Sequence, residues 1–135
     1  MSETPSSRII GTWRLVAAAA RDADGNALPA PYGPNGMGRV VFTADGRMMA
    51  VLCDGRPDLP PGVVRDYSSY CGNYTFDGKR LVTRVDAALD PSRVGSDQVR
   101  EVRFEGDRMI LRPPPRRTST GVEQRDITWE RIAPV

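Results

Sequence analysis

The chain has 135 residues, of which 39% are hydrophobic and 27% are charged, and its formal net charge at pH 7 is +2. This length and composition are typical of one folded domain, and so small a net charge argues against binding of nucleic acid or of an acidic membrane surface. The sequence contains no histidine, which excludes Ser-His-Asp and Cys-His catalysis and every histidine-ligated metal site. We expect no metal ion and no organic cofactor.

The N-terminal residues are polar and carry no basic segment followed by an apolar run, so the sequence predicts no secretory signal. The longest apolar run, residues 15–20, is far shorter than the ~20 residues that span a bilayer. The cysteines, Cys53 and Cys71, fit a reducing compartment as free thiols. We therefore expect a cytoplasmic protein that does not bind membranes, with residues 1–7 as a disordered tail and residues 8–135 as one domain.

A short helical turn that ends at Gly11 is predicted to precede the first strand. Alternating apolar residues then turn one face of that strand toward the core. These residues are Trp13, Leu15, Ala17 and Ala19. A loop rich in Pro and Gly follows over Leu28–Gly38.

Three hairpins come next along the chain. In each of them, two runs of alternating residues flank a turn that contains glycine. The turns lie at Asp45-Gly46, Asp77-Gly78 and Gly106-Asp107. A last strand is expected over about Val122–Ile132.

Two proline-rich loops, Asp54–Asp66 and Pro113–Gly121, interrupt these strands. No long apolar period of 3.6 residues is present, so helices are minor. About eight strands joined mostly by tight turns predict an all-β protein. The expected fold is a single up-and-down antiparallel β-barrel, since closure leaves no free strand edge; a two-sheet sandwich is the structural alternative.

Short motifs occur in a specific order along nearly the whole chain. They are Gly11-Thr12-Trp13-Arg14-Leu15-Val16, Asp22-Ala23-Asp24-Gly25, Tyr32-Gly33-Pro34-Asn35, Thr43-Ala44-Asp45-Gly46, Tyr70-Cys71-Gly72-Asn73-Tyr74, Asp97-Gln98-Val99-Arg100 and Trp129-Glu130-Arg131. In this order and spacing they resemble the bacterial and fungal lipocalin-like domain family, whose G-x-W signature corresponds to the first of them.

The resemblance implies a small β-barrel with a central cavity. It also implies that Arg131 packs over Trp13 at the closed end, with Gly11 and Trp129 as further closure residues. Many family members have no assigned activity, and some relatives in natural-product pathways resemble cyclases or isomerases. Family members often carry a histidine on the strand after the second hairpin turn; whether Thr83 occupies that position is left open.

Hairpin register indicates which residues face the cavity, because a two-residue turn fixes which residues oppose each other. Across the second turn it predicts the inward pairs Tyr74–Leu81, Gly72–Thr83 and Tyr70–Val85. Across the third turn it predicts the inward pairs Val102–Leu111 and Phe104–Met109. Arg100 is in phase with Val102, so its guanidinium should enter the barrel or its rim. There it needs a partner, from the ligand or from the protein.

Both faces of the hairpin over residues 39–53 are apolar. One face carries Val40, Phe42, Met49 and Val51, and the other carries Val41, Met48, Ala50 and Leu52. Which face lines the cavity is left open. One of the two faces could pack under the N-terminal turn or against another subunit, so a homodimer is also left open.

The predicted function is the binding of a small hydrophobic molecule with a polar or anionic group in the barrel cavity. The expected ligand contacts are Tyr70, Tyr74, Thr83, Val85, Arg100, Val102 and Phe104. The loops Leu28–Gly38 and Asp54–Asp66 are the expected lids.

Two alternatives belong to other functional classes. One is a cofactor-independent cyclase or isomerase that holds a polyketide- or polyene-like substrate in the same cavity. In it, Arg100 would stabilise negative charge while Tyr74 or Tyr70 donates a proton. The other is an interaction module with a filled barrel. The residues do not decide whether the protein is an enzyme.

Overall fold

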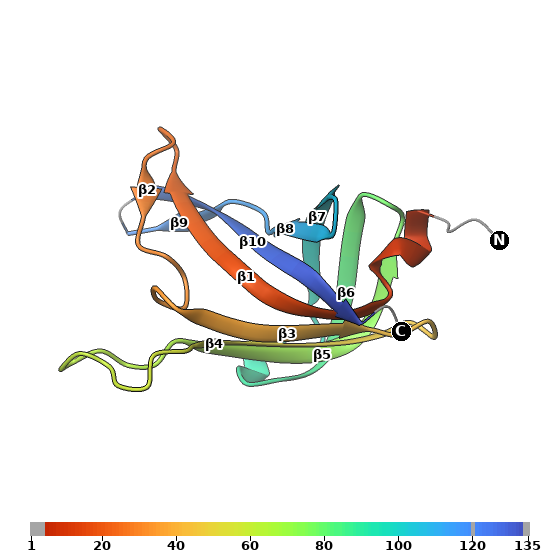
Figure 1. Cartoon of the computed structure of the whole chain (residues 1–135), viewed down its shortest axis with the longest axis horizontal. Helices are drawn as coiled ribbons and strands as arrows, with labels where there is room; N and C mark the ends of the chain where they lie inside the picture. The colour runs from red at the N-terminus through yellow and green to blue at the C-terminus, as the bar shows by residue number, and fades with distance from the viewer. Residues whose placement is uncertain (1–4, 120, 134–135) are drawn as a thin grey trace.

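The strands of this computed structural model form one sheet that closes on itself (Figure 1). Their bounds are β1 (Gly11–Asp22), β2 (Ala27–Leu28), β3 (Gly36–Phe42), β4 (Arg47–Asp54), β5 (Tyr67–Phe76), β6 (Arg80–Ala88), β7 (Asp97–Glu105), β8 (Arg108–Arg112), β9 (Arg116–Thr118) and β10 (Gly121–Ala133). The structure describes residues 5–119 and 121–133, and in these ranges the helices are two short 3-10 segments, η1 (Pro5–Ile9) and η2 (Pro91–Arg93).

The barrel wall runs in the order β1-β3-β4-β5-β6-β7-β8-β10, and antiparallel pairing of β10 with β1 closes it. The short strands β2 and β9 pair with β1 and β10 outside this ring. Closure leaves the wall strands with neighbours on both sides over most of their length. The predicted all-β up-and-down barrel is therefore confirmed, and the two-sheet alternative is wrong.

One end of the barrel is closed by η1 together with the end of β10, opposite the end that carries β2 and β9 (Figure 1). The indole N–H of Trp13 donates to the Ile9 carbonyl at 2.9 Å. The Arg131 guanidinium lies over the Trp13 ring, 4.2 Å from its centroid, and donates to the carbonyls of Ile10 and Arg8. Segments from both ends of the chain thus seal this end.

Three residues of the expected disordered tail, Pro5–Ser7, belong to η1 instead. Ile9, the last residue of η1, is completely buried and accepts the Trp13 hydrogen bond. These contacts fix η1 against the barrel. Residues 1–4 of the expected tail lie outside the described residues.

The first hairpin differs from its expected register by one residue. Thr43 pairs with Arg47, so the connection contains three residues and ends at Gly46, whose φ is +91°. A three-residue loop of this kind places its last residue in the left-handed region. Because the pairing is shifted by one residue, residues that were expected on opposite faces now share a face. Val40 lies opposite Ala50, and Phe42 lies opposite Met48.

The interior face of this hairpin is thereby settled. Its buried residues are Val40, Phe42, Met48, Ala50 and Leu52. Met49, which was expected to share a face with Val40, is 62% exposed on the outer surface.

The second hairpin also differs from expectation, with Tyr74 opposite Thr83 and Gly72 opposite Val85. Asp77 pairs with Arg80, so the turn is centred one residue later than expected. The register therefore shifts by two residues, which changes the partners but keeps every side chain on its expected face. A bulge between Cys71 and Gly72 then places Tyr70 opposite Ala88.

The third hairpin is confirmed, with Val102 opposite Leu111 and Phe104 opposite Met109. In β1, however, the pairing with β10 shifts between Leu15 and Ala17. Such a bulge reverses the alternation of the residues that follow it. Ala17 and Ala19 are consequently exposed, contrary to the prediction.

The loop expected at Pro113–Gly121 includes the strand β9, which pairs with the start of β10. Residue 120 lies outside the described residues.

Within the described ranges, no helix combines the length and apolar character that crossing a membrane requires.

Candidate functional site

A cavity of about 80 Å³ lies inside the barrel, away from η1. Most of its wall is apolar: Val40, Ala50, Leu52, Leu111, Pro113, Ile127 and Trp129. Its polar lining consists of Tyr32, Ser68, Tyr70, Arg93, Arg100 and Arg125. An apolar interior with a few polar groups at one side is the usual composition of a small-molecule site.

The barrel wall is incomplete next to this cavity. Strand β8 ends at Arg112, whereas residues 97–100 of β7 continue and pair with β6 on one side. Pro113 follows β8 and cannot donate a ladder hydrogen bond. Pro113, Arg100 and Arg125 all line the cavity at this level, which gives it a polar mouth.

Two guanidinium groups at the mouth share one neutral acceptor. Arg93 Nη2 donates to Gln98 Oε1 at 2.8 Å, and Arg100 Nη2 donates to the same oxygen at 3.3 Å. Arg93 Nη1 also donates to Ser68 Oγ at 3.2 Å, and Arg100 Nη1 donates to the Val99 carbonyl at 2.8 Å.

Neither of these two groups forms a salt bridge with a carboxylate in the described part of the chain. Arg93 lies over the Tyr70 ring, 4.4 Å from its centroid, and is held there by this cation–π contact. Arg125 differs, because Glu123 accepts from its Nε at 2.6 Å. Arg93 and Arg100 therefore carry positive charge with no carboxylate of the described chain within salt-bridge distance.

Arg93 was not predicted from the sequence, although a signal for its position exists. Asp90 caps η2 by accepting from the Ser92 backbone N–H at 3.0 Å, and Pro91 occupies the first helical position. An Asp-Pro pair of this kind is a common helix start. It fixes a tight turn between β6 and β7 that carries Arg93 back over Tyr70.

Tyr32 was also missed as a lining residue. Its φ is +65°, a strained value for a residue with a side chain, and its backbone N–H donates to Asp66 Oδ2 at 3.1 Å. Burial raises the pKa of its phenol, and the nearby Ser68 side chain acts in the opposite direction. The motif around Tyr32 was visible in the sequence, but nothing local indicated that this side chain turns inward.

The two expected lid loops meet at Asp54. This carboxylate is only 2% exposed, and Arg56 Nη2 donates to it at 2.6 Å. A Cβ on Gly33 would lie 2.5 Å from Asp54 Oδ2, so glycine is required beside Tyr32. The hydrogen bonds from Arg56 lower the pKa of Asp54.

The substitution Asp54→Asn should therefore remove a pH-dependent part of the stability. Because the folded-state pKa is lowered, the wild-type advantage should be complete above the ordinary Asp pKa of about 3.9. It should decline as the pH falls below that value and vanish below the folded-state pKa. Thermal unfolding of both proteins across this range measures the difference, with the exposed Asp58→Asn as the control. If the wild type remained more stable than Asp54→Asn at pH values well below the ordinary Asp pKa, the lowered pKa of Asp54 would be contradicted.

The structure separates the residues that were predicted to contact a ligand. Tyr70 and Arg100 line the cavity. Tyr74 instead donates its hydroxyl to the Thr43 carbonyl at 2.6 Å and packs edge-on against Phe42.

The other predicted contacts lie in or against the packed core. Thr83 and Val85 are each 1% exposed, and Val102 and Phe104 pack against the core cluster. Trp129, which was predicted as a closure residue, lines the cavity. A correspondence between Thr83 and the histidine of family members stays a prediction.

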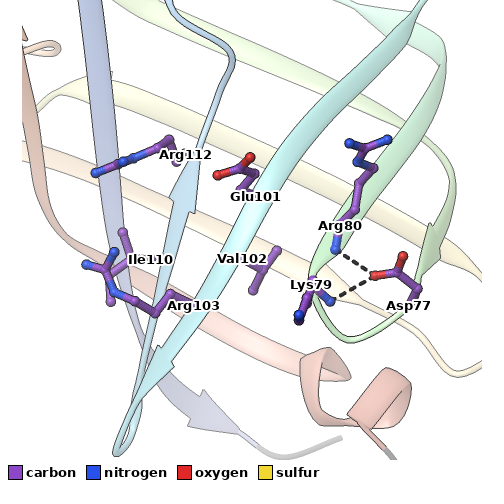
Figure 2. Close-up of a pocket in the computed structure, with 8 residues that line it drawn as sticks. All are labelled: Asp77, Lys79, Arg80, Glu101, Val102, Arg103, Ile110 and Arg112. Carbon is purple, nitrogen blue, oxygen red and sulfur yellow. Dashed lines mark hydrogen bonds between the residues drawn. The ribbon is translucent and has the colours of Figure 1, made fainter.

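A larger groove of about 630 Å³ lies on the outer surface over β6, β7 and β8 (Figure 2). Two of its arginines are paired within the protein: Arg112 pairs with Asp126 at 2.8 Å and Arg103 with Glu105 at 3.1 Å. Asp77 accepts from two backbone N–H groups of its own turn. We place the site in the inner cavity, where burial and unpaired charge coincide. Among the described residues, no acidic or cysteine cluster could hold a metal ion.

The comparison with family models agrees with this fold. The family model described as a lipocalin-like domain matches residues 10–132. Among solved structures, the chain is similar to the lipoprotein YedD from Klebsiella pneumoniae subsp. pneumoniae, with 10% sequence identity and a TM-score of 0.45 over 92% of this chain and 71% of that one. None of the curated proteins that were compared matches the chain.

Proposed function

Because this chain belongs to the lipocalin-like domain family, we propose that it binds a small, mostly apolar molecule with an anionic group inside its barrel. The observation that carries the proposal is the pair Arg93 and Arg100. Both guanidinium groups line an apolar cavity, share the Gln98 amide oxygen and lack a carboxylate partner among the described residues. Guanidinium groups in this arrangement favour a carboxylate or a similar planar anion.

The cavity dimensions limit the size of the ligand. The volume of about 80 Å³ is below the roughly 300–1,000 Å³ of pockets that enclose drug-sized molecules. The enclosed apolar part should therefore be a short chain, with the anion held at the mouth. Burial of that chain contributes roughly 25 cal/mol per Å² of apolar surface.

The direct test compares isocaproate with isocaproamide, which has the same carbon skeleton without the charge. Wild-type protein should bind the carboxylate and should bind the amide much more weakly. Arg100→Gln and Arg93→Gln should each weaken carboxylate binding about tenfold or more, because a hydrogen bond to a charged group contributes about 1.5–3 kcal/mol. Isothermal titration calorimetry measures these affinities.

Arg103→Gln is the matched control, since Arg103 lies on the same strand but faces outward and pairs with Glu105. It should leave the affinity unchanged. Equal binding of the acid and the amide, or an equal loss in the control variant, would contradict the proposal.

Native mass spectrometry of freshly purified protein should reveal a bound acidic molecule and its identity. The same spectrum tests the homodimer, which stays a prediction. We also propose a cytoplasmic location, supported by the free thiols of Cys53 and Cys71.

The cyclase or isomerase alternative has less support. Its proton donor Tyr74 is bound to the Thr43 carbonyl, and the cavity is small for a polyketide- or polyene-like substrate. Tyr70, beneath Arg93, is the remaining candidate donor of the pair that was predicted. Turnover of such a substrate that is lost in Tyr70→Phe and retained in Tyr74→Phe would favour this alternative.

A further inference from the structure

We propose that Gln98 makes the cavity mouth selective for anionic ligands, because its neutral side chain holds Arg93 and Arg100 together without cancelling their charge. Gln98 is not among the described residues that line the cavity, whereas both arginines are. It is therefore a positioning residue, which acts on a ligand through the two guanidinium groups. The inference rests on the proposed function, since it concerns the same anion-binding mouth.

The hydrogen bonds of Gln98 fix the direction of its amide group. Its Oε1 accepts from Arg93 Nη2 at 2.8 Å and from Arg100 Nη2 at 3.3 Å. Guanidinium groups only donate, so the amide oxygen must face them. Gln98 Nε2 donates to Ser96 Oγ at 3.3 Å, and this hydroxyl donates to the Arg93 carbonyl at 2.5 Å. Gln98 thus links β7 to η2 through the side chain of Arg93 and, by way of Ser96, through its backbone.

A carboxylate takes the same bridging position for another pair of arginines. Glu123 Oε1 accepts from Arg125 Nε at 2.6 Å and from Arg116 Nε at 2.9 Å, and Arg125 also lines the cavity. A carboxylate shared in this way compensates part of the positive charge, and its hydrogen bonds are charge-assisted. At Gln98 an amide of the same shape stands in place of the carboxylate, so both charges remain available to a ligand.

The neutral acceptor is unfavourable for the protein without a ligand. Two guanidinium groups that contact one oxygen repel each other, and an amide offsets this repulsion less than a carboxylate does. Arg93 and Arg100 each donate two hydrogen bonds to protein acceptors. A guanidinium has more N–H groups than these bonds use, so an anion at the mouth can accept from those that remain. A purely structural role would favour glutamate at this position.

The first variant is Gln98→Glu, which introduces a carboxylate of nearly the same shape. It keeps an acceptor for both arginines and loses only the N–H that donates to Ser96 Oγ. Isocaproate should bind about tenfold or more weakly than to the wild type, because the introduced carboxylate pairs with the arginines and repels the ligand. The thermal midpoint of the unliganded variant should rise. Isothermal titration calorimetry and thermal unfolding measure the two effects.

The second variant is Gln98→Met, since methionine has a similar length and its sulfur is only a weak acceptor. The arginines then keep their charge but lose the atom that holds them together. Isocaproate should bind more weakly than to the wild type but more tightly than to Gln98→Glu, and the thermal midpoint should fall. Gln98→Glu should therefore be the more stable variant and the weaker binder. A purely structural role would make it the better of the two in both measurements.

The matched control for the added charge is Asn73→Asp. Asn73 Oδ1 accepts from Arg47 Nη1 at 3.0 Å at an exposed position, and neither residue lines the cavity. The substitution makes the same change from amide to carboxylate beside an arginine, and it should leave the affinity for isocaproate unchanged. An equal loss of affinity in Asn73→Asp and Gln98→Glu would show that only the net charge matters, and it would overturn the inference.

The outcomes separate this inference from the proposed function. If Gln98→Glu bound isocaproate as tightly as the wild type while Arg100→Gln weakened binding, the inference would be overturned and the proposed function would stand. A Gln98→Glu protein that is less stable than Gln98→Met, or that binds isocaproate more tightly than Gln98→Met does, would also overturn the inference. Failure of isocaproate to bind the wild-type protein would contradict both.

Discussion

Trp13→Ala should lower the free energy of unfolding by about 3–5 kcal/mol, as expected for the truncation of a buried aromatic residue. Trp13 is 1% exposed, and its ring is covered by Arg131 and lies 6.4 Å from Phe104. Its N–H also ties η1 to β1 through the Ile9 carbonyl. The substitution therefore leaves a cavity and releases the cap at the closed end. Urea denaturation monitored by circular dichroism measures the loss.

The matched comparison is between Trp13→Phe and Trp129→Phe. The first removes a hydrogen bond that is made, whereas the second removes an N–H that has no acceptor among the described residues. Trp13→Phe should therefore be the more destabilising by about 1 kcal/mol. If Trp13→Ala lowered the free energy of unfolding by less than about 1 kcal/mol, the packing of η1 and Arg131 at the closed end would not depend on this ring.

Gly72→Ala should destabilise the protein by about 3 kcal/mol, at the upper end of the range for overpacking. A Cβ at Gly72 would lie 2.0 Å from the carbonyl oxygen of Arg84 and 3.1 Å from the Cα of Val85. Both are backbone atoms of the neighbouring strand, so no side-chain rotation relieves the contact. The clash falls beside the bulge between Cys71 and Gly72, so β5 and β6 would have to separate there. Thermal or urea unfolding measures the effect.

Gly36→Ala is the control for this substitution. Its Cβ would meet the Leu15 Cδ2 at 3.2 Å, the end of a flexible side chain. The expected change is below about 1 kcal/mol, since alanine also restricts the unfolded chain. Equal losses at Gly72 and Gly36 would mean that β5 and β6 are not held as closely as the structure describes.

The alternation of residues and the glycine-containing turns were sufficient to predict the barrel. Each hairpin strand was identified, and the third hairpin has the predicted pairing because its turn contains two residues, Gly106 and Asp107. The first hairpin was wrong because its loop contains three residues, and an odd change in loop length exchanges the faces. In β1 a single bulge after Leu15 had the same effect on Ala17 and Ala19.

Of the two arginines at the cavity mouth, only Arg100 could be predicted from the sequence. Arg100 lies in a regular strand next to a tight hairpin, so its phase relative to Val102 was enough to turn it inward. Arg93 lies in a short 3-10 turn, and its direction depends on contacts with Ser68 and Tyr70 on a strand distant in sequence.

The sequence by itself determined the eight strands of the barrel wall, the approximate positions of the three hairpin turns and the inward phase of Arg100, because these depend on local alternation and turn chemistry. Only the tertiary structure decided which side chains share the cavity. Tyr32 and Arg93 reach it from loops, and the N–H of Trp13 is satisfied by η1 while that of Trp129 has no such partner in the described chain. These outcomes depend on contacts between residues far apart in sequence, which no local pattern encodes.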